Sequence, residues 1–480
     1  MRIGQTSAIH FASQVISTVV GFLATLLIAR ELGAGVLGTY SLVVAVVIWL
    51  QVIGDMGIRK ALEKRLSEPG SDGPYLAAGA AVQFGLFAVI VALVLALGDA
   101  ASALADVPMA RVLGPFGPAV VALTGVSLLF AFLLAVLRGQ HRVHVAALLD
   151  PAERTVRSAL QIGAVVATLG LVGLLAGYAL AGLAASALAL AFVAGRPERP
   201  GREHLGGLLS YSQYSWLGGL TNRAFKSMDT IVLGLFVTSE LIGIYEVAWN
   251  VASILAVFGV SISQALFPEM SRLSSAERSA TVAGLVEDAL AYTGLFVVPG
   301  FVGAALLGDR VLAIYGGAFA RGHLVLVVLV AARLVYAYGN QFVNTLNAID
   351  RPDAAFRVNG AFATTNVVLN LVLVARYGWL GAAVATTVSA LVTLVFGYRA
   401  LAAVVEVAVP TGEIAKQWIA AGAMGLVVAA GRALLGGSLP VTLVLVACGA
   451  LVYFAVLSGL SERFRSTVYD NLPAAIVGGR

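Results

Sequence analysis

Long apolar segments constrain this chain more than any other feature of its sequence. Fourteen stretches of about 20 mostly apolar residues follow one another, separated by turn or charge signals. Their approximate ranges are 9–29, 39–58, 75–97, 116–137, 151–169, 171–193, 215–237, 242–266, 285–307, 323–348, 355–375, 379–402, 414–435 and 439–459. Each is long enough to cross a bilayer as a helix, which satisfies its own backbone polar groups. The sequence therefore predicts an all-α polytopic membrane protein.

The composition agrees with this prediction and excludes other classes of protein. Hydrophobic residues make up 60% of the 480 residues, and charged residues only 11%. A soluble protein carries about 25% charged residues, and a disordered chain is poor in apolar ones. Cys448 is the single cysteine, which excludes a disulfide scaffold. The first segment lacks an A-x-A cleavage pattern, so we expect it to be retained.

Basic residues are distributed unevenly between the two sides of the membrane. With the N-terminus placed in the cytoplasm, 21 of the 30 Lys and Arg residues fall on the cytoplasmic side and six fall outside. The other three, Arg223, Lys226 and Arg333, lie within segments. Because cytoplasmic loops carry an excess of Lys and Arg, both termini are expected in the cytoplasm. We expect a multi-pass protein of the cell (plasma or inner) membrane.

Segments one to six resemble segments seven to twelve at an offset of about 205–209 residues. The run Gly38-Thr39-Tyr40 corresponds to Gly243-Ile244-Tyr245, and Gly170 corresponds to Gly378. Six segments per repeat is an even number, so the repeats are parallel and related by a pseudo-twofold axis along the membrane normal. The predicted organisation is an N-lobe (1–195), a cytoplasmic linker (196–214), a C-lobe (215–405), and two additional helices with a cytoplasmic tail (406–480).

Polar residues recur on one face of four of the predicted helices. They include His10 and Gln14 in the first segment, Glu246 and Asn250 in the eighth, Arg333, Asn340 and Asn344 in the tenth, and Asn366 and Asn370 in the eleventh. A polar residue inside the membrane faces either another helix or a water-filled cavity. Hydrogen bonding between helices explains any single stripe, but four stripes together favour a shared hydrated cavity.

The seventh segment concentrates charge. Arg223, Lys226 and Asp229 are spaced by three residues and share one side of a helix, where each charge costs about 2.5–3.5 kcal/mol at the membrane centre. Lys226 and Asp229 can form an ion pair, which leaves Glu246 or an anionic ligand as the partner of Arg223. A structural salt-bridge network is the alternative. We expect a phosphate site made by Arg223, Lys226 and Arg333, with Asp229 and Glu246 balancing charge or binding H⁺ or Na⁺.

Several other patterns carry no chemistry. Gly33–Gly38 fits G-x-G-x-x-G, but it joins two membrane helices and follows no strand. His141 and His144 lack further clustered ligands, so we expect no metal site. No nucleophile with a base and no pair of catalytic carboxylates emerges. The sequence therefore predicts a transporter rather than an enzyme, with no cofactor and no nucleic-acid partner.

Four stretches resemble polysaccharide transporters of the MATE-like, MOP-type flippase superfamily. They are Ile28–Tyr40, Met228–Gly234 with Ile242–Tyr245, Leu266–Pro268 with Ser271–Leu273, and Tyr377–Ala383. The resemblance covers essentially the whole chain and implies two six-helix lobes followed by two C-terminal helices. Glu246 is a departure, because the family usually has a small residue there.

Within the superfamily, the resemblance implies an O-antigen-type flippase that moves a lipid-linked oligosaccharide from the cytoplasmic to the outer leaflet by alternating access. Glu63–Glu68 and the excess of Arg over Lys, 26 to 4, resemble halophilic archaeal members, which implies a dolichyl phosphate carrier. A bacterial member would use undecaprenyl diphosphate. The implied partners are the lipid-linked oligosaccharide, membrane lipids and glycosyltransferases of the same pathway. A MATE-type multidrug antiporter that exports cations is the alternative, although its cavity would need a net acidic charge.

Overall fold

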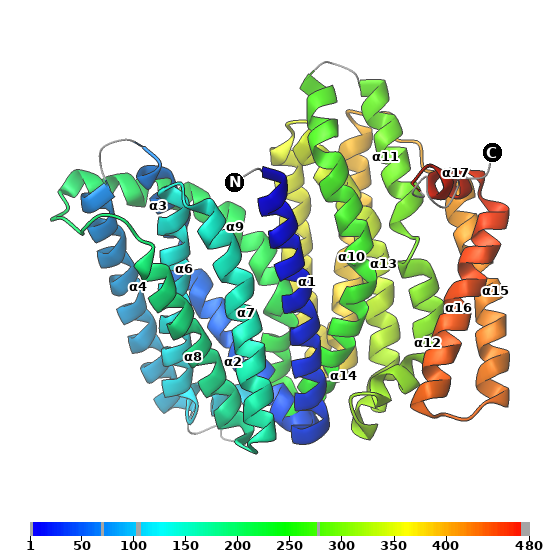
Figure 1. Ribbon diagram of the computed structural model, residues 1–480, viewed down its shortest axis with the longest axis horizontal. Coiled ribbons are helices and arrows are strands. Elements are labelled where there is room, and N and C mark those ends of the chain that lie inside the picture. Colours follow the sequence, from blue (N-terminus) through cyan, green and yellow to red (C-terminus); the bar gives the residue numbers. More distant parts are fainter. Residues whose placement is uncertain (1–2, 69–71, 102–106, 276–278, 472–480) are drawn as a thin grey trace. The chain divides into compact units, whose positions relative to one another are not determined.

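The computed structural model describes residues 3–68, 72–101, 107–275 and 279–471, and every regular element in these ranges is a helix (Figure 1). For some of these residues, among them 3–12 and 213–226, only the backbone is described. The chain forms two compact units, Met1–Glu246 and Val247–Arg480.

The first unit is built from the N-terminal helices. They are α1 (Ile3–Leu27), a π-helical turn (Ile28–Leu32), α2 (Gly33–Asp55), α3 (Ile58–Leu66), α4 (Asp72–Ala101), α5 (Pro108–Leu113), α6 (Gly117–Gly139), α7 (Val143–Val166), α8 (Gly170–Ala191), α9 (Arg202–Phe236) and the start of α10 (Ser239–Ser275). Helix α9 packs against α2, α3 and α4, so it belongs to this unit by its contacts. The predicted lobe boundary at 196–214 follows the internal repeat rather than packing, and it stays a prediction.

The second unit contains the rest of α10 and the helices that follow it. They are α11 (Ser279–Thr293), α12 (Val297–Ala313), a 3-10 turn (Gly317–Gly322), α13 (His323–Ala348), α14 (Pro352–Ala402), α15 (Thr411–Leu434), α16 (Leu439–Leu460) and α17 (Glu462–Asn471). Helix α12 packs against α13 and α15, and α15 packs against α16. The two predicted additional helices are thus α15 and α16.

Each of the fourteen predicted segments lies on a helix or a pair of helices, which confirms the polytopic all-α fold. Segments eleven and twelve are the two halves of α14, which bends at Gly378, where φ is +58°. By length and hydropathy, nine stretches of the described residues qualify as spans. Pro352–Ala402 contains two predicted segments, and Ile16–Asp55 covers most of two others. Helix α7 does not qualify, because it carries Asp150, Glu153, Arg154 and Arg157.

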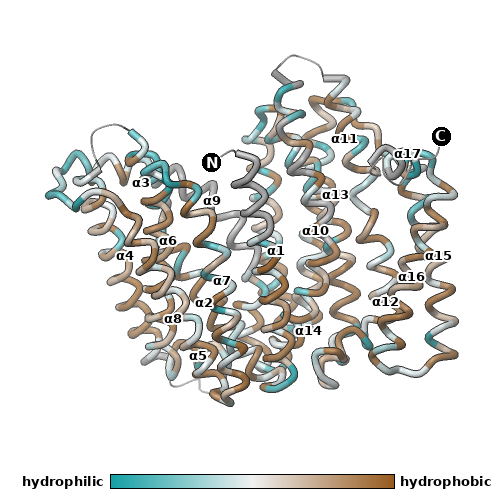
Figure 2. Tube along the Cα trace, in the orientation of Figure 1, coloured by the Kyte–Doolittle hydropathy of each residue, from teal (hydrophilic) through white to brown (hydrophobic). Residues whose placement is uncertain are grey.

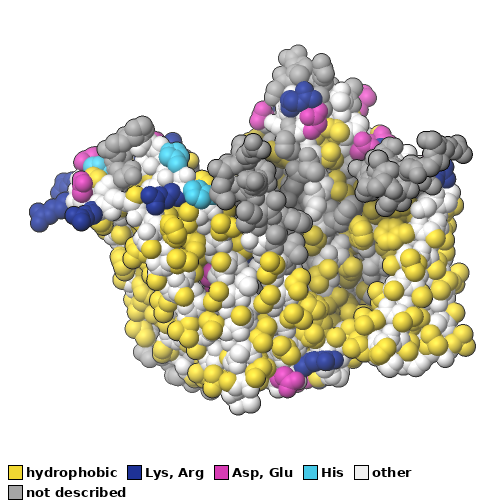
Figure 3. Space-filling view, in the orientation of Figure 1, with side chains coloured by type: hydrophobic (Ala, Val, Ile, Leu, Met, Phe, Trp, Pro, Cys, Tyr) yellow, Lys and Arg dark blue, Asp and Glu magenta, His cyan; other side chains and the backbone are white. Residues whose placement is uncertain are grey.

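Apolar side chains cover the outside of the helices. Phe84 on α4, Leu426 on α15 and Leu451 on α16 are each at least 70% exposed. Figure 2 shows that apolar residues occupy the middle of the helices. In Figure 3, hydrophobic side chains cover the flanks in view, and most of the charged side chains that can be seen lie at helix ends. A soluble monomer does not expose apolar surface so extensively, whereas lipid accommodates it.

Helices α2 and α10 cross where two glycines meet. A Cβ atom on Gly38 would overlap the Ser239 carbonyl oxygen and lie 2.7 Å from the Gly243 nitrogen. A Cβ atom on Gly243 would overlap the Ala34 carbonyl oxygen and lie 2.9 Å from the Gly38 nitrogen. Because Ser239 and Gly243 are Ala34 and Gly38 shifted by 205 residues, the contact is the same from both sides. A twofold axis produces this kind of reciprocal contact.

Left-handed residues recur at nearly the same offset. Gly170 before α8 has a φ of +57°, and Gly378, 208 residues later, has a φ of +58°. His141, between α6 and α7, has a φ of +57°, and Asp350, between α13 and α14, has a φ of +56°. Non-glycine residues adopt this conformation uncommonly. The turns of the two halves are therefore built alike, which supports the predicted repeat.

We expect Gly38→Ala to destabilise the protein, because the new methyl group would overlap backbone rather than a movable side chain. Overpacking costs about 1–3 kcal/mol, which exceeds the gain of about 1 kcal/mol from replacing a helical glycine. The melting temperature of the purified protein in detergent measures the effect. Gly35→Ala on the same helix is the control, because nothing lies within 4 Å of its Cβ position. Equal melting temperatures for the two variants would contradict the close crossing.

Candidate functional site

Arg333 on α13 is held by two side chains of α10 within the second unit. Its Nη2 donates a hydrogen bond to Ser253 Oγ at 2.6 Å, and its guanidinium lies 4.1 Å from the centre of the Trp249 ring. Trp249 and Ser253 are four residues apart and so share one face of α10. A cation over an aromatic ring gains about 0.5–2 kcal/mol, more when water is excluded. These contacts fix the orientation of the guanidinium, as recognition of an oxyanion requires.

Three of the predicted glycan-binding amides remain accessible. Asn340 and Asn344 are half-buried on α13, at helical spacing from Arg333, and Asn250 is exposed on α10 directly after Trp249. An amide offers both donors and an acceptor, which suits a sugar hydroxyl. Their placement is compatible with the predicted role in binding sugar, which stays a prediction.

The other two predicted glycan-binding amides are buried in α14. Asn366 is 5% exposed and Asn370 is fully buried. The Asn366 amide donates a hydrogen bond to Thr386 Oγ1 at 3.4 Å, and the Asn370 amide donates to the Asn366 carbonyl at 3.0 Å. Thr386 lies beyond the bend at Gly378, so the bond from Asn366 joins the two halves of α14, whereas the bond from Asn370 lies within the first half. In this conformation the pair serves helix packing, and a sugar could reach it only after the helices move.

Two successive residues of α9 are bonded to two successive residues of α10. The Tyr245 hydroxyl donates to Asp229 Oδ2 at 2.5 Å, and the Thr230 hydroxyl donates to Glu246 Oε1 at 2.5 Å. Asp229 is 7% exposed and Tyr245 is 1% exposed. Hydrogen bonds to carboxylates are among the stronger ones. Both predicted coupling carboxylates therefore lie at the junction of α9 and α10.

Three predicted site residues have side chains outside the described part of the structure. They are Arg223 and Lys226, whose backbone belongs to α9, and His10, whose backbone belongs to α1. Their predicted roles in binding phosphate and lining a cavity stay predictions. Gln14, also on α1, is exposed, and its carbonyl accepts a hydrogen bond from the Thr18 hydroxyl at 2.8 Å.

A further charged cluster lies on α7, where we predicted no buried charged residue from the sequence. Glu153 is 8% exposed, and its carboxylate lies 3.7 Å from Arg157 Nη2. The Arg157 guanidinium lies 4.4 Å from the Tyr178 ring of α8. Gln161, one turn later, donates to the Tyr40 hydroxyl of α2 at 2.6 Å.

The position of the helix start explains why this cluster was missed. The predicted segment begins at 151, but α7 begins at Val143, so Glu153 and Arg157 lie within the helix rather than at its end. Their spacing of four residues, which favours an ion pair on one helix face, was the available signal.

Residues 3–274 match the family described as "Polysaccharide biosynthesis protein". This chain belongs to that family. The "Probable flippase AglR" of Haloferax volcanii is 30% identical over 99% of both chains. The "Probable low-salt glycan biosynthesis flippase Agl15" of the same organism is 25% identical over 98% of this chain and 99% of the relative. The resemblance to flippases of halophilic archaea is thereby confirmed.

Solved structures show the fold of this polysaccharide biosynthesis family member. "Lipid II flippase MurJ, inward closed conformation" has a TM-score of 0.78 and 14% identity, and the match covers 96% of this chain and all of that one. An inward-facing multidrug resistance MATE family transporter of the MOP superfamily has a TM-score of 0.66 and 14% identity, over 81% of this chain and 98% of that one. At these identities the likeness concerns the fold alone.

We expect Tyr245→Phe to reduce the free energy of unfolding by about 1.5–3 kcal/mol, because the variant removes a donor to the buried Asp229 carboxylate. Chemical denaturation in detergent measures the change. Tyr398→Phe is the matched control, since Tyr398 is 42% exposed. If the two variants lose the same free energy, the bond to Asp229 contributes no stability.

Proposed function

We propose that this protein is a flippase that moves a lipid-linked oligosaccharide from the cytoplasmic to the outer leaflet of the cell membrane. The observation that carries the proposal is the similarity, over 99% of both chains, to a relative named as a probable flippase. The name of a second relative adds glycan biosynthesis. The fold shared with a lipid II flippase is consistent with this function.

The chemistry of the cargo sets the requirement that such a protein must meet. Sugar hydroxyls and a phosphate lose their hydrogen bonds to water in hydrocarbon, at a cost of roughly 2–7 kcal/mol for each uncompensated polar group. A flippase lowers this barrier by offering polar groups to the head group. In our proposal Arg333, oriented by Trp249 and Ser253, meets the phosphate, and nearby amides such as Asn340 and Asn344 meet hydroxyls.

The internal repeat supports an alternating-access mechanism. In transporters built from repeats, one repeat rocks against the other around a central site, and the recurrent turns described above show that both halves are built alike. We propose that the lipid tail stays in the bilayer while the head group is carried across. In this proposal both termini are cytoplasmic, and Asp229 or Glu246 binds the H⁺ or Na⁺ that couples the cycle.

A MATE-type antiporter is the other candidate with the same architecture. The MATE likeness is at 14% identity and so concerns the fold alone, whereas the relatives at 25–30% identity are named flippases. We therefore favour the flippase.

Deletion of the gene is expected to trap lipid-linked glycan on the cytoplasmic face, because its synthesis would continue without export. Leaflet-specific labelling of the glycan, with mass spectrometry of the lipid fraction, measures this, and complementation with the wild-type chain is the control. Normal surface glycosylation combined with increased sensitivity to cationic drugs would contradict the proposal and identify an antiporter instead.

Arg333→Ala and Arg223→Ala are expected to reduce glycan export by roughly 10–100-fold, because each removes a charge-assisted donor for the phosphate. Arg333→Lys should recover only part of the activity, since an ammonium cannot form the bidentate contact. Arg357→Ala is the control, because its side chain is 81% exposed on α14. Normal export by the alanine variants, at equal amounts of inserted protein, would refute the phosphate-site assignment.

A further inference from the structure

The two sides of the Arg65 guanidinium, at the C-terminal end of α3, have different surroundings. Nη1 donates a hydrogen bond to Glu68 Oε2 at 3.1 Å. Nε, on the other side, is buried and has no hydrogen-bond partner among the described residues. A buried donor without a partner is costly, and the edge formed by Nε and Nη2 can bind an oxyanion through two parallel hydrogen bonds. This edge is therefore suited to an anionic ligand.

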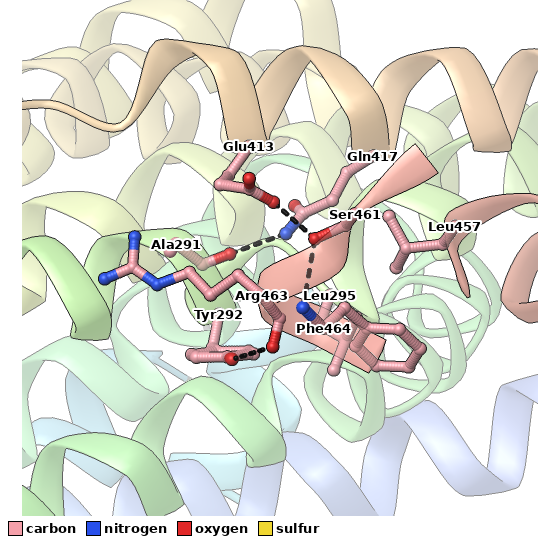
Figure 4. A pocket seen from close by; sticks show the side chains of 9 residues that line it. All are labelled: Ala291, Tyr292, Leu295, Glu413, Gln417, Leu457, Ser461, Arg463 and Phe464. Carbon is pink, nitrogen blue, oxygen red and sulfur yellow. Dashed lines mark hydrogen bonds between the residues drawn. The ribbon is translucent and has the colours of Figure 1, made fainter. Parts of the chain in front are cut away.

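An arginine of the second unit shows the contrasting arrangement. Arg463 on α17 lines a pocket together with Gln417 of α15 (Figure 4). Its Nη1 lies 3.2 Å from Glu287 Oε1, and its Nη2 contacts Asp288 Oδ1. Carboxylates thus neutralise both terminal nitrogens of Arg463, whereas Arg65 pairs through Nη1 with Glu68.

The Nε–Nη2 edge of Arg65 faces Gly207 on α9 and the Tyr75 hydroxyl on α4. A Cβ atom on Gly207 would lie 3.6 Å from Arg65 Nη2, 3.7 Å from Arg65 Nε and 3.3 Å from Tyr75 Oη. The guanidinium carbon also lies 6.0 Å from the centre of the Tyr75 ring. Three donors from two helices therefore converge on one position, beside a residue that has no side chain.

An apolar cluster fixes the three helices that carry these groups. Leu66 of α3, Leu76 of α4 and Leu208 of α9 are all buried in it. Each of them directly follows one of the three converging residues in the sequence. The donors are thus positioned by packed helices rather than by a loop, as a specific binding site requires.

The charge around this position is mainly positive. The exposed charged residues of α3 and of the segment 196–203 are two acids, Glu198 and Glu203, and five cations. The cations are Lys60, Lys64, Arg196, Arg199 and Arg202. The segment lies against the start of α4, because the Glu198 amide donates to the Gly73 carbonyl at 3.1 Å. Figure 3 shows Lys, Arg and His side chains at the end of the first unit where Figure 1 labels α3.

Helix ends add to this positive charge. Helix α4 begins at Asp72 and α9 begins at Arg202, so two N-terminal ends, each with a partial positive charge, lie near the position. The C-terminal end of α3, which carries a partial negative charge, is the third. The balance of the three helix ends favours an anion.

We propose that the position beside Gly207 binds a phosphate group, with Arg65 Nε, Arg65 Nη2 and Tyr75 Oη as donors. Lys64, whose Nζ lies 4.6 Å from the centre of the Tyr211 ring one turn further along α9, supplies a second cation. In the predicted topology this end of the helices is cytoplasmic, so a phospholipid head group and free phosphate are both sources of the ligand. The proposal concerns anion binding by the folded protein and does not rest on the flippase function.

The test measures melting temperatures of the purified full-length protein with inorganic phosphate, dioctanoyl phosphatidic acid or dioctanoyl phosphatidylcholine, at equal ionic strength. The measurements use the Arg223→Ala, Arg333→Ala background, which removes the two arginines of the other proposed phosphate site. A ligand that binds the folded state stabilises it. We therefore expect inorganic phosphate or phosphatidic acid to raise the melting temperature by at least about 2 °C relative to phosphatidylcholine.

The pattern of shifts identifies the source of the ligand. A shift with inorganic phosphate shows that the phosphate group alone suffices. A shift with phosphatidic acid and none with inorganic phosphate assigns the site to a lipid head group. The absence of a shift with either ligand would overturn the proposal.

Variants that lose one donor group locate the site. Arg65→Gln removes the bidentate edge and Tyr75→Phe removes only a hydroxyl, and each should lower the shift by more than half. Lys60→Gln is the matched control, because it removes the same charge from α3 at a side chain that is 72% exposed, and it should keep the full shift. Equal losses in Lys60→Gln and Arg65→Gln would show that diffuse surface charge holds the anion, and would overturn the proposal. A shift that survives both Arg65→Gln and Tyr75→Phe would do the same.

Discussion

Hydrocarbon gives a polar group no hydrogen-bond partner, and each compact unit of this protein answers that constraint from within. The backbone satisfies itself by forming helices. Buried side chains use the neighbouring helix, as Tyr245 does with Asp229 between α9 and α10, and as Arg333 does with Ser253 between α13 and α10. Because lipid cannot compensate a lost partner, these bonds also determine which helices stay together.

Close helix crossings depend on glycine in a chain with 53 glycines. At the crossing of α2 and α10, Gly38 and Gly243 let two backbones approach. Gly38 faces the Ser239 carbonyl and Gly243 faces the Ala34 carbonyl, and Ala34 and Ser239 are equivalent positions of the two repeats. Without a hydrophobic force between helices in lipid, such close approach supplies much of the packing energy. The crossing therefore combines two properties of the chain, its glycine content and its internal repeat, in a single contact. It gives the repeat a physical consequence beyond similarity of sequence.

Much of the fold could be predicted because helix formation in a membrane is governed by local hydropathy. All fourteen predicted segments lie on helices, and Gly378 marks the boundary between two of them. The predicted positions of the helix ends were less accurate, because polar residues can continue a helix beyond the apolar stretch. The start of α7 at Val143 placed Glu153 and Arg157 inside the helix, and their ion pair was missed for that reason. The burial of Asn366 depends on the bend of α14, which periodicity alone does not contain.

By itself, the sequence determined the class of protein, the succession of helices, the repeat and the few polar residues within the segments. Each of these follows from composition or from the 3.6-residue period of a single helix. Only the tertiary structure decided which of those residues meet. Arg333 finds Ser253 across 80 residues of sequence, and Gln417 reaches the Ala291 carbonyl across 126. Such partnerships depend on how helices pack, and packing is set by the shapes of many side chains together rather than by the pattern along any one segment.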